Sequence, residues 1–155
     1  FDLAQTLHEV LDTLRPGLRL RPLQLEVDFC DAVAMDSFPG PLGQVVMNLV
    51  TNAVNHAFDG RAAGVIRVSA VRQSDSVVRV TIEDNGVGIP TEHLGQIFDP
   101  FFTTKLGSGG SGLGLSISHR ITSKVLGGSI TVHSVVGSGT RFDLVLPVKA
   151  PSVVF

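Results

Sequence analysis

Three asparagines in the segment from Gln44 to Phe58 have a spacing that could bind a metal ion carrying phosphate ligands. Asn48, Asn52 and Asn55 stand at positions i, i+4 and i+7, which places their amides on one stripe of a helix. Because asparagine is a mediocre helix former, several on one stripe indicate a role other than helicity. Mg²⁺ prefers oxygen ligands and takes the rest of its shell from water and substrate phosphates. The stripe therefore predicts a magnesium and phosphate site, with a solvated polar face as the alternative.

The segment DNGVGIP, which begins at Asp84, could recognise a flat ligand that carries an exocyclic amine. Asp84 ends a predicted strand, and Gly86 and Gly88 leave room for such a ligand to approach the backbone. Adenine offers an amine to the carboxylate where guanine has a carbonyl, and leaving a buried polar group unpaired costs about 1–3 kcal/mol. The segment thus favours ATP over GTP. Alone, it is equally compatible with an ordinary turn after a strand.

The segment GSGGSGLGLSIS could hold phosphate groups. Its glycines leave the chain flexible, and a helix that begins near Leu113 would direct free amides and its positive dipole end toward a bound anion. The match to GxGxxG does not indicate a dinucleotide site, because no strand precedes it and no acidic residue follows at the required distance. The Walker pattern is absent too. A plain linker is disfavoured, because the glycines directly precede a strong helix pattern.

The periodicity of apolar residues predicts the elements that must position these groups. Helical spacing covers residues 4–20, with a kink or break expected at Pro16, and then residues 41–58 and 113–126. Alternating strands are predicted for residues 23–29, 65–72, 77–84, 129–136 and 140–148. The glycine-rich segment that follows Asp84 lacks periodicity, so we expect a mobile lid over about residues 94–112. Residues 149–155 are interpreted as a tail.

This order of elements predicts an α+β fold, a two-layer α/β sandwich with helices on one face of a mixed, mostly antiparallel sheet. A chain of 155 residues with 43% hydrophobic content can bury one core, so we expect a single domain over residues 1–155. The formal net charge of -2 provides no basic field, which argues against nucleic acid or an anionic membrane as a partner.

The sequence also bears on the compartment. Cys30 is the only cysteine, which excludes an internal disulfide and fits a reducing environment. No apolar run is long enough to span a bilayer, and no signal peptide is recognisable. We therefore expect a cytoplasmic domain without membrane contact of its own. Because the chain starts at Phe1, we expect it to be a piece of a longer protein, whose other parts could include a membrane anchor.

Histidines could be metal ligands or bases, but here they are scattered without the paired spacing of a metal site. Four of them are expected to be structural or exposed, namely His8, His93, His119 and His133. His56 is the exception, because it borders the asparagine stripe and could lie over an adenine ring.

Taken in order, five segments resemble the sequence boxes of sensor histidine kinases. QVVMNLVTNAVNHAF is similar to their asparagine box, DNGVGIP to the first glycine box, IFDPFFTTK to the phenylalanine box, GSGLGLSIS to the second glycine box and GSGTRF to the closing glycine motif. Each is weak alone, but the five in order between Gln44 and Phe142 are specific. The resemblance implies the Bergerat ATP-binding fold, which gyrase, heat-shock chaperone and mismatch-repair ATPases share.

The resemblance also implies roles for particular residues. Asn52 would bind Mg²⁺ with Asn48 beside it, and Asp84 would bind adenine. Lys105 would contact phosphate, and the lid would close on the phosphates while Phe101 and Phe102 pack the lid or its partner surface. The remaining residues expected to bind the nucleotide are Asn55, His56, Gly86, Gly88, Ile89, Phe101, Thr104, Gly110, Ser111, Gly112, Leu113, Gly114 and Thr140.

Three positions depart from related sequences. Many relatives carry Lys or Arg at the position of Asn55 and tyrosine at that of His56, which could alter nucleotide affinity. Hydrolytic relatives carry a glutamate base at the position of Asn48. Because a neutral amide is a poor proton acceptor, water attack should be slow, which favours a kinase over an ATPase. His8 begins like a phosphoacceptor motif, but the residues after it do not fit.

We therefore expect Mg-ATP binding and γ-phosphoryl donation to a histidine on a separate dimerisation and phosphotransfer domain, within two-component signal transduction. A response regulator would be reached only indirectly. The alternatives are a protein-serine kinase of the anti-sigma-factor type, which shares the fold and most boxes, and a non-catalytic nucleotide-sensing module.

Overall fold

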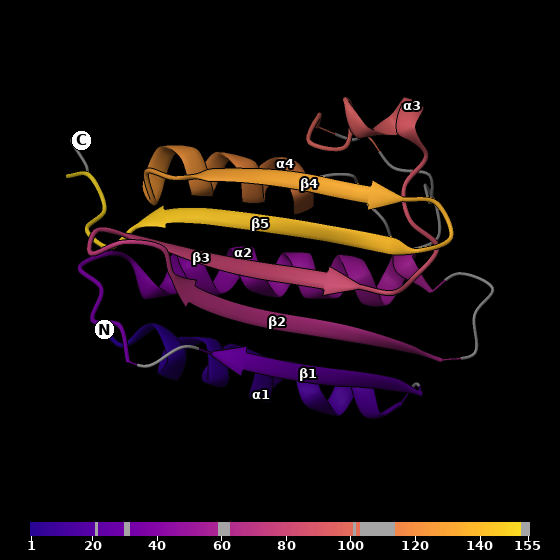
Figure 1. Cartoon of the computed structure of the whole chain (residues 1–155), viewed down its shortest axis with the longest axis horizontal. Helices are drawn as coiled ribbons and strands as arrows, with labels where there is room; N and C mark the ends of the chain where they lie inside the picture. The colour runs from indigo at the N-terminus through magenta and orange to yellow at the C-terminus, as the bar shows by residue number, and fades with distance from the viewer. Residues whose placement is uncertain (21, 30–31, 59–62, 101, 103–113, 153–155) are drawn as a thin grey trace.

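A five-stranded sheet is the base on which every other element of the domain is placed. The computed structural model describes residues 1–20, 22–29, 32–58, 63–100, 102 and 114–152 (Figure 1). The sheet order is β1-β2-β3-β5-β4, in which β1 and β2 are parallel and the other neighbours antiparallel. The strands are β1 (Leu23–Phe29), β2 (Gly64–Arg72), β3 (Val77–Asp84), β4 (Ser129–Val135) and β5 (Gly139–Pro147).

The helices cover one face of this sheet, as Figure 1 shows for the three longest. They are α1 (Leu3–Arg19), α2 (Pro39–Asn52), the short α3 (Thr91–Leu94) and α4 (Gly114–Arg120). Two π-helical turns, η1 (Ala53–Ala57) and η2 (Ile121–Val125), continue α2 and α4 directly. The predicted two-layer α+β sandwich with a mixed, mostly antiparallel sheet is therefore confirmed.

The apolar half of α2 lies in the centre of the core. It buries Leu42, Val45, Val46, Leu49 and Val50. Alternate residues of the central strands face them, and the apolar side of α1 completes the cluster. The fully or almost fully buried residues include Leu7 and Leu11 of α1 and, from the strands, Val68, Val80, Ile82 and Leu144. Because burial of apolar area is the main stabilising term in folding, α2 can turn only its polar side toward solvent or a ligand.

Three details differ from the sequence-based expectation, and one expectation is not tested. α1 runs through Pro16 to Arg19 without a break; the proline removes one helical bond, the one that its N–H would make to the Asp12 carbonyl. α2 begins earlier than predicted, with Pro39 at its first position, where a proline is well tolerated. α3 lies in a segment expected to have no regular structure. Cys30 and most of the predicted lid lie outside the described residues.

No helix within the part of the chain that the structure describes has both the length and the apolar character needed to cross a membrane.

The core assignment predicts a clear contrast between two substitutions in strands. Leu144→Ala, at a side chain that is 0% exposed, should lower the free energy of unfolding by about 2–5 kcal/mol because it leaves a cavity. Val71→Ala, at a residue that is 51% exposed, should cost less than about 1 kcal/mol. Urea denaturation monitored by circular dichroism measures both, and similar losses would contradict the assignment.

Candidate functional site

Several residues selected from the sequence, within the part of the chain that the structure describes, converge at one end of the sheet. β3 ends there at Asp84, β4 ends beside it, and the last turns of α2 with η1 reach the same end, as do the loop after β3 and α3 (Figure 1). This convergence follows from the topology, because α2 and β3 both run toward this end before the chain turns back. Three segments far apart in sequence therefore share one site.

Two adjoining cavities form the site. The smaller, of about 50 Å³, is lined by Asp84 and Thr140 together with core residues. The larger, of about 390 Å³, is lined among others by His93 and Phe102. Both include four residues in their walls, namely Asn52, His56, Gly88 and Ile89. The site is therefore continuous, with a carboxylate at the narrow end and a wide mouth at the other.

The carboxylate of Asp84 is held by the backbone. Its Oδ1 accepts a hydrogen bond from the Gly86 amide at 2.9 Å and another from the Thr140 amide at 3.3 Å. Asp84 pairs with Thr140 in the register of β3 and β5, so the second bond joins neighbouring strands. Backbone groups on two neighbouring strands therefore fix the position of this carboxylate.

A serine hydroxyl fixes the wall next to this carboxylate. The backbone amide of Ile89 donates to Ser134 Oγ at 2.7 Å, and Ser134 Oγ donates to the Gly139 carbonyl at 3.0 Å. Ser134 Oγ also lies 2.9 Å from Thr140 Oγ1. Through these bonds, β4 and β5 hold two of the predicted site residues, Ile89 and Thr140, in place.

The two glycines after Asp84 are required by protein packing. A Cβ on Gly86 would lie 2.1 Å from the Ala57 carbonyl at the end of η1. Gly88 has φ +78°, and a Cβ there would lie 2.4 Å from the carbonyl of Val135. From the sequence, Gly86 and Gly88 are expected to leave room for a flat ligand at the backbone. The structure instead shows that they admit two pieces of backbone, which shapes the pocket indirectly.

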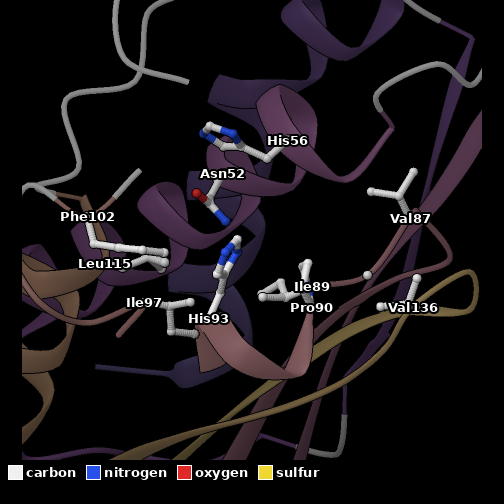
Figure 2. A pocket seen from close by; sticks show the side chains of 11 residues that line it. Asn52, His56, Val87, Ile89, Pro90, His93, Ile97, Phe102, Leu115 and Val136 are labelled. Carbon is white, nitrogen blue, oxygen red and sulfur yellow. The ribbon is translucent and has the colours of Figure 1, made fainter. Parts of the chain in front are cut away.

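The asparagine stripe divides into three environments. Asn52 lines both cavities, and Figure 2 shows its amide facing the space between the rings of His56 and His93. Asn48 lies one turn earlier and donates from Nδ2 to Ser118 Oγ of α4 at 3.3 Å. Asn55 is exposed and lines neither cavity.

His56 lines both cavities, and the contact with adenine expected of it stays a prediction. His93 is a residue that sequence reasoning missed. His93 points into the larger cavity (Figure 2), with its ring edge-on to Phe102 at a centroid distance of 5.4 Å. No pattern could have selected it, because a four-residue helix has no apolar periodicity. Sequence reasoning also missed Val87, Pro90, Ile97, Leu115 and Val136 as cavity-lining residues.

The ionisable groups of the site do not form a metal centre of the usual kind. Within the described residues, no group of three or more His, Cys, Asp or Glu side chains could hold a metal ion. A cation bound here would take neutral amide oxygens from α2.

Seven predicted site residues lie outside the described ranges: Phe101, Thr104, Lys105, Gly110, Ser111, Gly112 and Leu113. Gly114 is the first residue of α4. The roles expected of all eight stay predictions.

Comparison with known proteins gives a consistent result. The family described as histidine kinase-, DNA gyrase B- and HSP90-like ATPase matches residues 39–150. Sensor histidine kinase ZraS of Escherichia coli O157:H7 is 36% identical over 149 residues, which cover 96% of this chain and 31% of that protein. Signal transduction histidine-protein kinase AtoS of Escherichia coli K12 is 45% identical over 108 residues, covering 70% of this chain and 17% of that protein.

Among solved structures, the nucleotide-free catalytic domain of histidine kinase ThkA is similar with a TM-score of 0.84 and 27% identity, over 96% of this chain and 94% of that one. The chain therefore spans a small part of ZraS and AtoS but nearly all of a solved catalytic domain.

The glycine geometry predicts a graded loss of stability. Gly137→Ala places a Cβ in open space at φ +86°, so it should cost roughly 1–2 kcal/mol from backbone strain alone. Gly88→Ala adds a clash with fixed backbone to the same strain, and should cost at least about 1 kcal/mol more. Urea unfolding of the two variants side by side measures the difference. Equal losses would show that the turn between β4 and β5 does not pack on Gly88.

Proposed function

The chain belongs to the family of histidine kinase-, DNA gyrase B- and HSP90-like ATPases, as a catalytic domain of the sensor histidine kinase type, and from this premise we propose that it holds Mg-ATP and donates the γ-phosphoryl group to a histidine on a separate domain. The observation that supports the proposal most is the continuous site that joins the Asp84 carboxylate to the Asn52 amide.

The narrow end of the site suits an adenine base. Asp84 is kept in place by two backbone amides, and Thr140 and Ile89 beside it are fixed through Ser134. A fixed carboxylate accepts a hydrogen bond from the exocyclic amine of adenine without reorganising. Because guanine has a carbonyl in the equivalent place, it would bring a second acceptor toward the carboxylate in place of a donor, so the site should discriminate against GTP.

The wide end suits the ribose and phosphates, with Mg²⁺ among them. Asn52 presents a neutral amide there, and Asn48 lies one turn along the same helix. One or two neutral oxygens from the protein fit Mg²⁺, which takes its remaining ligands from phosphates and water. When bound, Mg²⁺ would neutralise part of the phosphate charge. Lys105 and the lid residues Thr104, Gly110, Ser111 and Gly112 are proposed to contact the phosphates.

The absence of a base at position 48 supports transfer over hydrolysis. In this chain, a carboxylate that could activate water is replaced by the amide of Asn48, which takes up no proton in the relevant pH range. Phosphoryl transfer needs mainly alignment and charge neutralisation, which amides and a lysine can supply. ATP would therefore be kept for the histidine of a dimerisation and phosphotransfer domain, with a response regulator downstream.

The base-recognition step predicts a loss of affinity in Asp84→Asn. The asparagine Oδ1 can still accept from Gly86 and Thr140, but its amide group presents N–H toward the amine of adenine. Affinity for a non-hydrolysable ATP analogue should fall about tenfold or more, because a hydrogen bond to a charged group is lost. Isothermal titration calorimetry measures the change. Glu83→Gln, one residue earlier on the opposite face of the strand, is the control and should bind as the wild type does.

Transfer to histidine is separated from its alternatives by the chemistry of the product. The chain is mixed with Mg²⁺, γ-labelled ATP and a purified kinase phosphotransfer hairpin. We expect acid-labile label on the hairpin and no label on the chain itself. Acid-stable label would indicate a serine kinase, and ATP binding without any transfer would indicate a nucleotide-sensing module.

A further inference from the structure

A buried serine on α4 contacts Asn48, the first residue of the asparagine stripe. Ser118 is 0% exposed, and α4 packs against α2 at this point. Its hydroxyl is within hydrogen-bond distance of two groups, the Gly114 carbonyl at 2.8 Å and Asn48 Nδ2 at 3.3 Å. The bond to the carbonyl four residues earlier is common for serine in helices. The bond to Asn48 crosses between helices.

The single proton of the Ser118 hydroxyl determines how Asn48 can bind to it. The proton is donated to the Gly114 carbonyl, which is the closer acceptor, so Oγ can only accept from Asn48. An acceptor attracts the Nδ2 end of the amide and repels the Oδ1 end. The amide is therefore held with Nδ2 toward α4 and Oδ1 turned away from Ser118.

We propose that Ser118 is a positioning residue: by accepting from Nδ2 it holds the amide of Asn48 with the carbonyl oxygen turned away from α4, so that this oxygen is available to the Mg²⁺ and phosphates proposed to bind beside Asn52, one turn along α2. This inference rests on the proposed function, because it assigns a direction to the Asn48 side chain within that site. It also links Asn48 to Gly114, the residue with which α4 begins after the glycine-rich segment. Burial of Ser118 keeps water from competing for either bond.

The π-helical turn η2, which continues α4, provides a contrasting residue four positions further on. Thr122 is likewise 0% exposed, yet its Oγ1 has no hydrogen-bond partner in the described structure. Burial on this side of the helix is therefore not enough to give a hydroxyl a hydrogen-bond partner. Thr122→Val removes a hydroxyl of similar burial without removing a bond, which makes it the matched control for Ser118.

The first test compares two substitutions of the same shape. Ser118→Val and Ser118→Thr differ only in the hydroxyl, so any strain from the added atoms is common to both. Ser118→Val should weaken binding of a Mg-ATP analogue about three- to tenfold in calorimetry, the range expected for one hydrogen bond. Ser118→Thr and Thr122→Val should stay within about twofold of the wild type. Adenosine, which lacks phosphates, should bind all variants alike.

A double-mutant cycle then separates positioning from general damage. In an Asn48→Ala background, Ser118→Val should have no further effect on affinity for the Mg-ATP analogue, because the amide that it positions is gone. Equal losses with Asn48 and without it would overturn the proposal, as would equal affinities of the Val and Thr variants.

A measurement on the wild-type chain keeps the proposal testable even if the variants do not fold. In ¹⁵N–¹H spectra of the ligand-free chain, the Nδ2 protons of Asn48 should exchange with solvent at least tenfold more slowly than those of the exposed Gln44. Exchange at equal rates would overturn the hydrogen bond and the inference with it. If the wild type binds no ATP analogue, the proposed function fails, but the exchange measurement still decides the contact.

Discussion

Burial of the apolar side of α2 against the sheet is the constraint on which the site depends. Val45, Val46 and Leu49 are fully or almost fully buried, so the rotation of the helix about its axis is fixed. The fixed rotation also sets the directions of the two asparagines on this helix. Asn52 faces the end of β3, and Asn48, four residues earlier, faces α4. Because the cost of removing such apolar contacts is several kcal/mol, packing determines the geometry of polar groups that contribute little to stability themselves.

The second fixed part is the carboxyl end of β3, where backbone groups do most of the positioning. Asp84 is held by two amides, and the chain that follows it packs so closely on η1 and on the turn after β4 that positions 86 and 88 exclude side chains. A site built in this way is preorganised: the ligand need not order these groups, so little of its binding free energy is spent on rearrangement. Ser134 and Ser118 extend the same principle, because each uses one hydroxyl to hold a neighbouring element.

Strong periodicity made most of the architecture predictable from the sequence. The strands and α2 each repeat an apolar pattern over seven or more residues, and such patterns leave little choice of face. That Asn52, His56, Asp84 and Thr140 lie together was predictable as well, because five motifs in order constrain each other; their roles toward a nucleotide stay predictions. The sequence could not show which residues distant along the chain are in contact in the fold. His93 lies on a helix too short to have a pattern, the close approach of Ala57 explains Gly86 only in three dimensions, and the bond between Asn48 and Ser118 joins residues 70 positions apart.

The central claim is that an adenine nucleotide lies between the Asn52 side of α2 and the Asp84 end of β3. ¹⁵N–¹H spectra of the chain titrated with a Mg-bound, non-hydrolysable ATP analogue test it directly, since backbone amides and asparagine side chains both give signals. The account predicts that the largest shifts occur at the backbone amides of Gly86 and Thr140 and at the side-chain amide of Asn52, with none at Arg67 on the open face of the sheet. Unchanged signals at the first three positions, or the largest shifts on the open face, would contradict it.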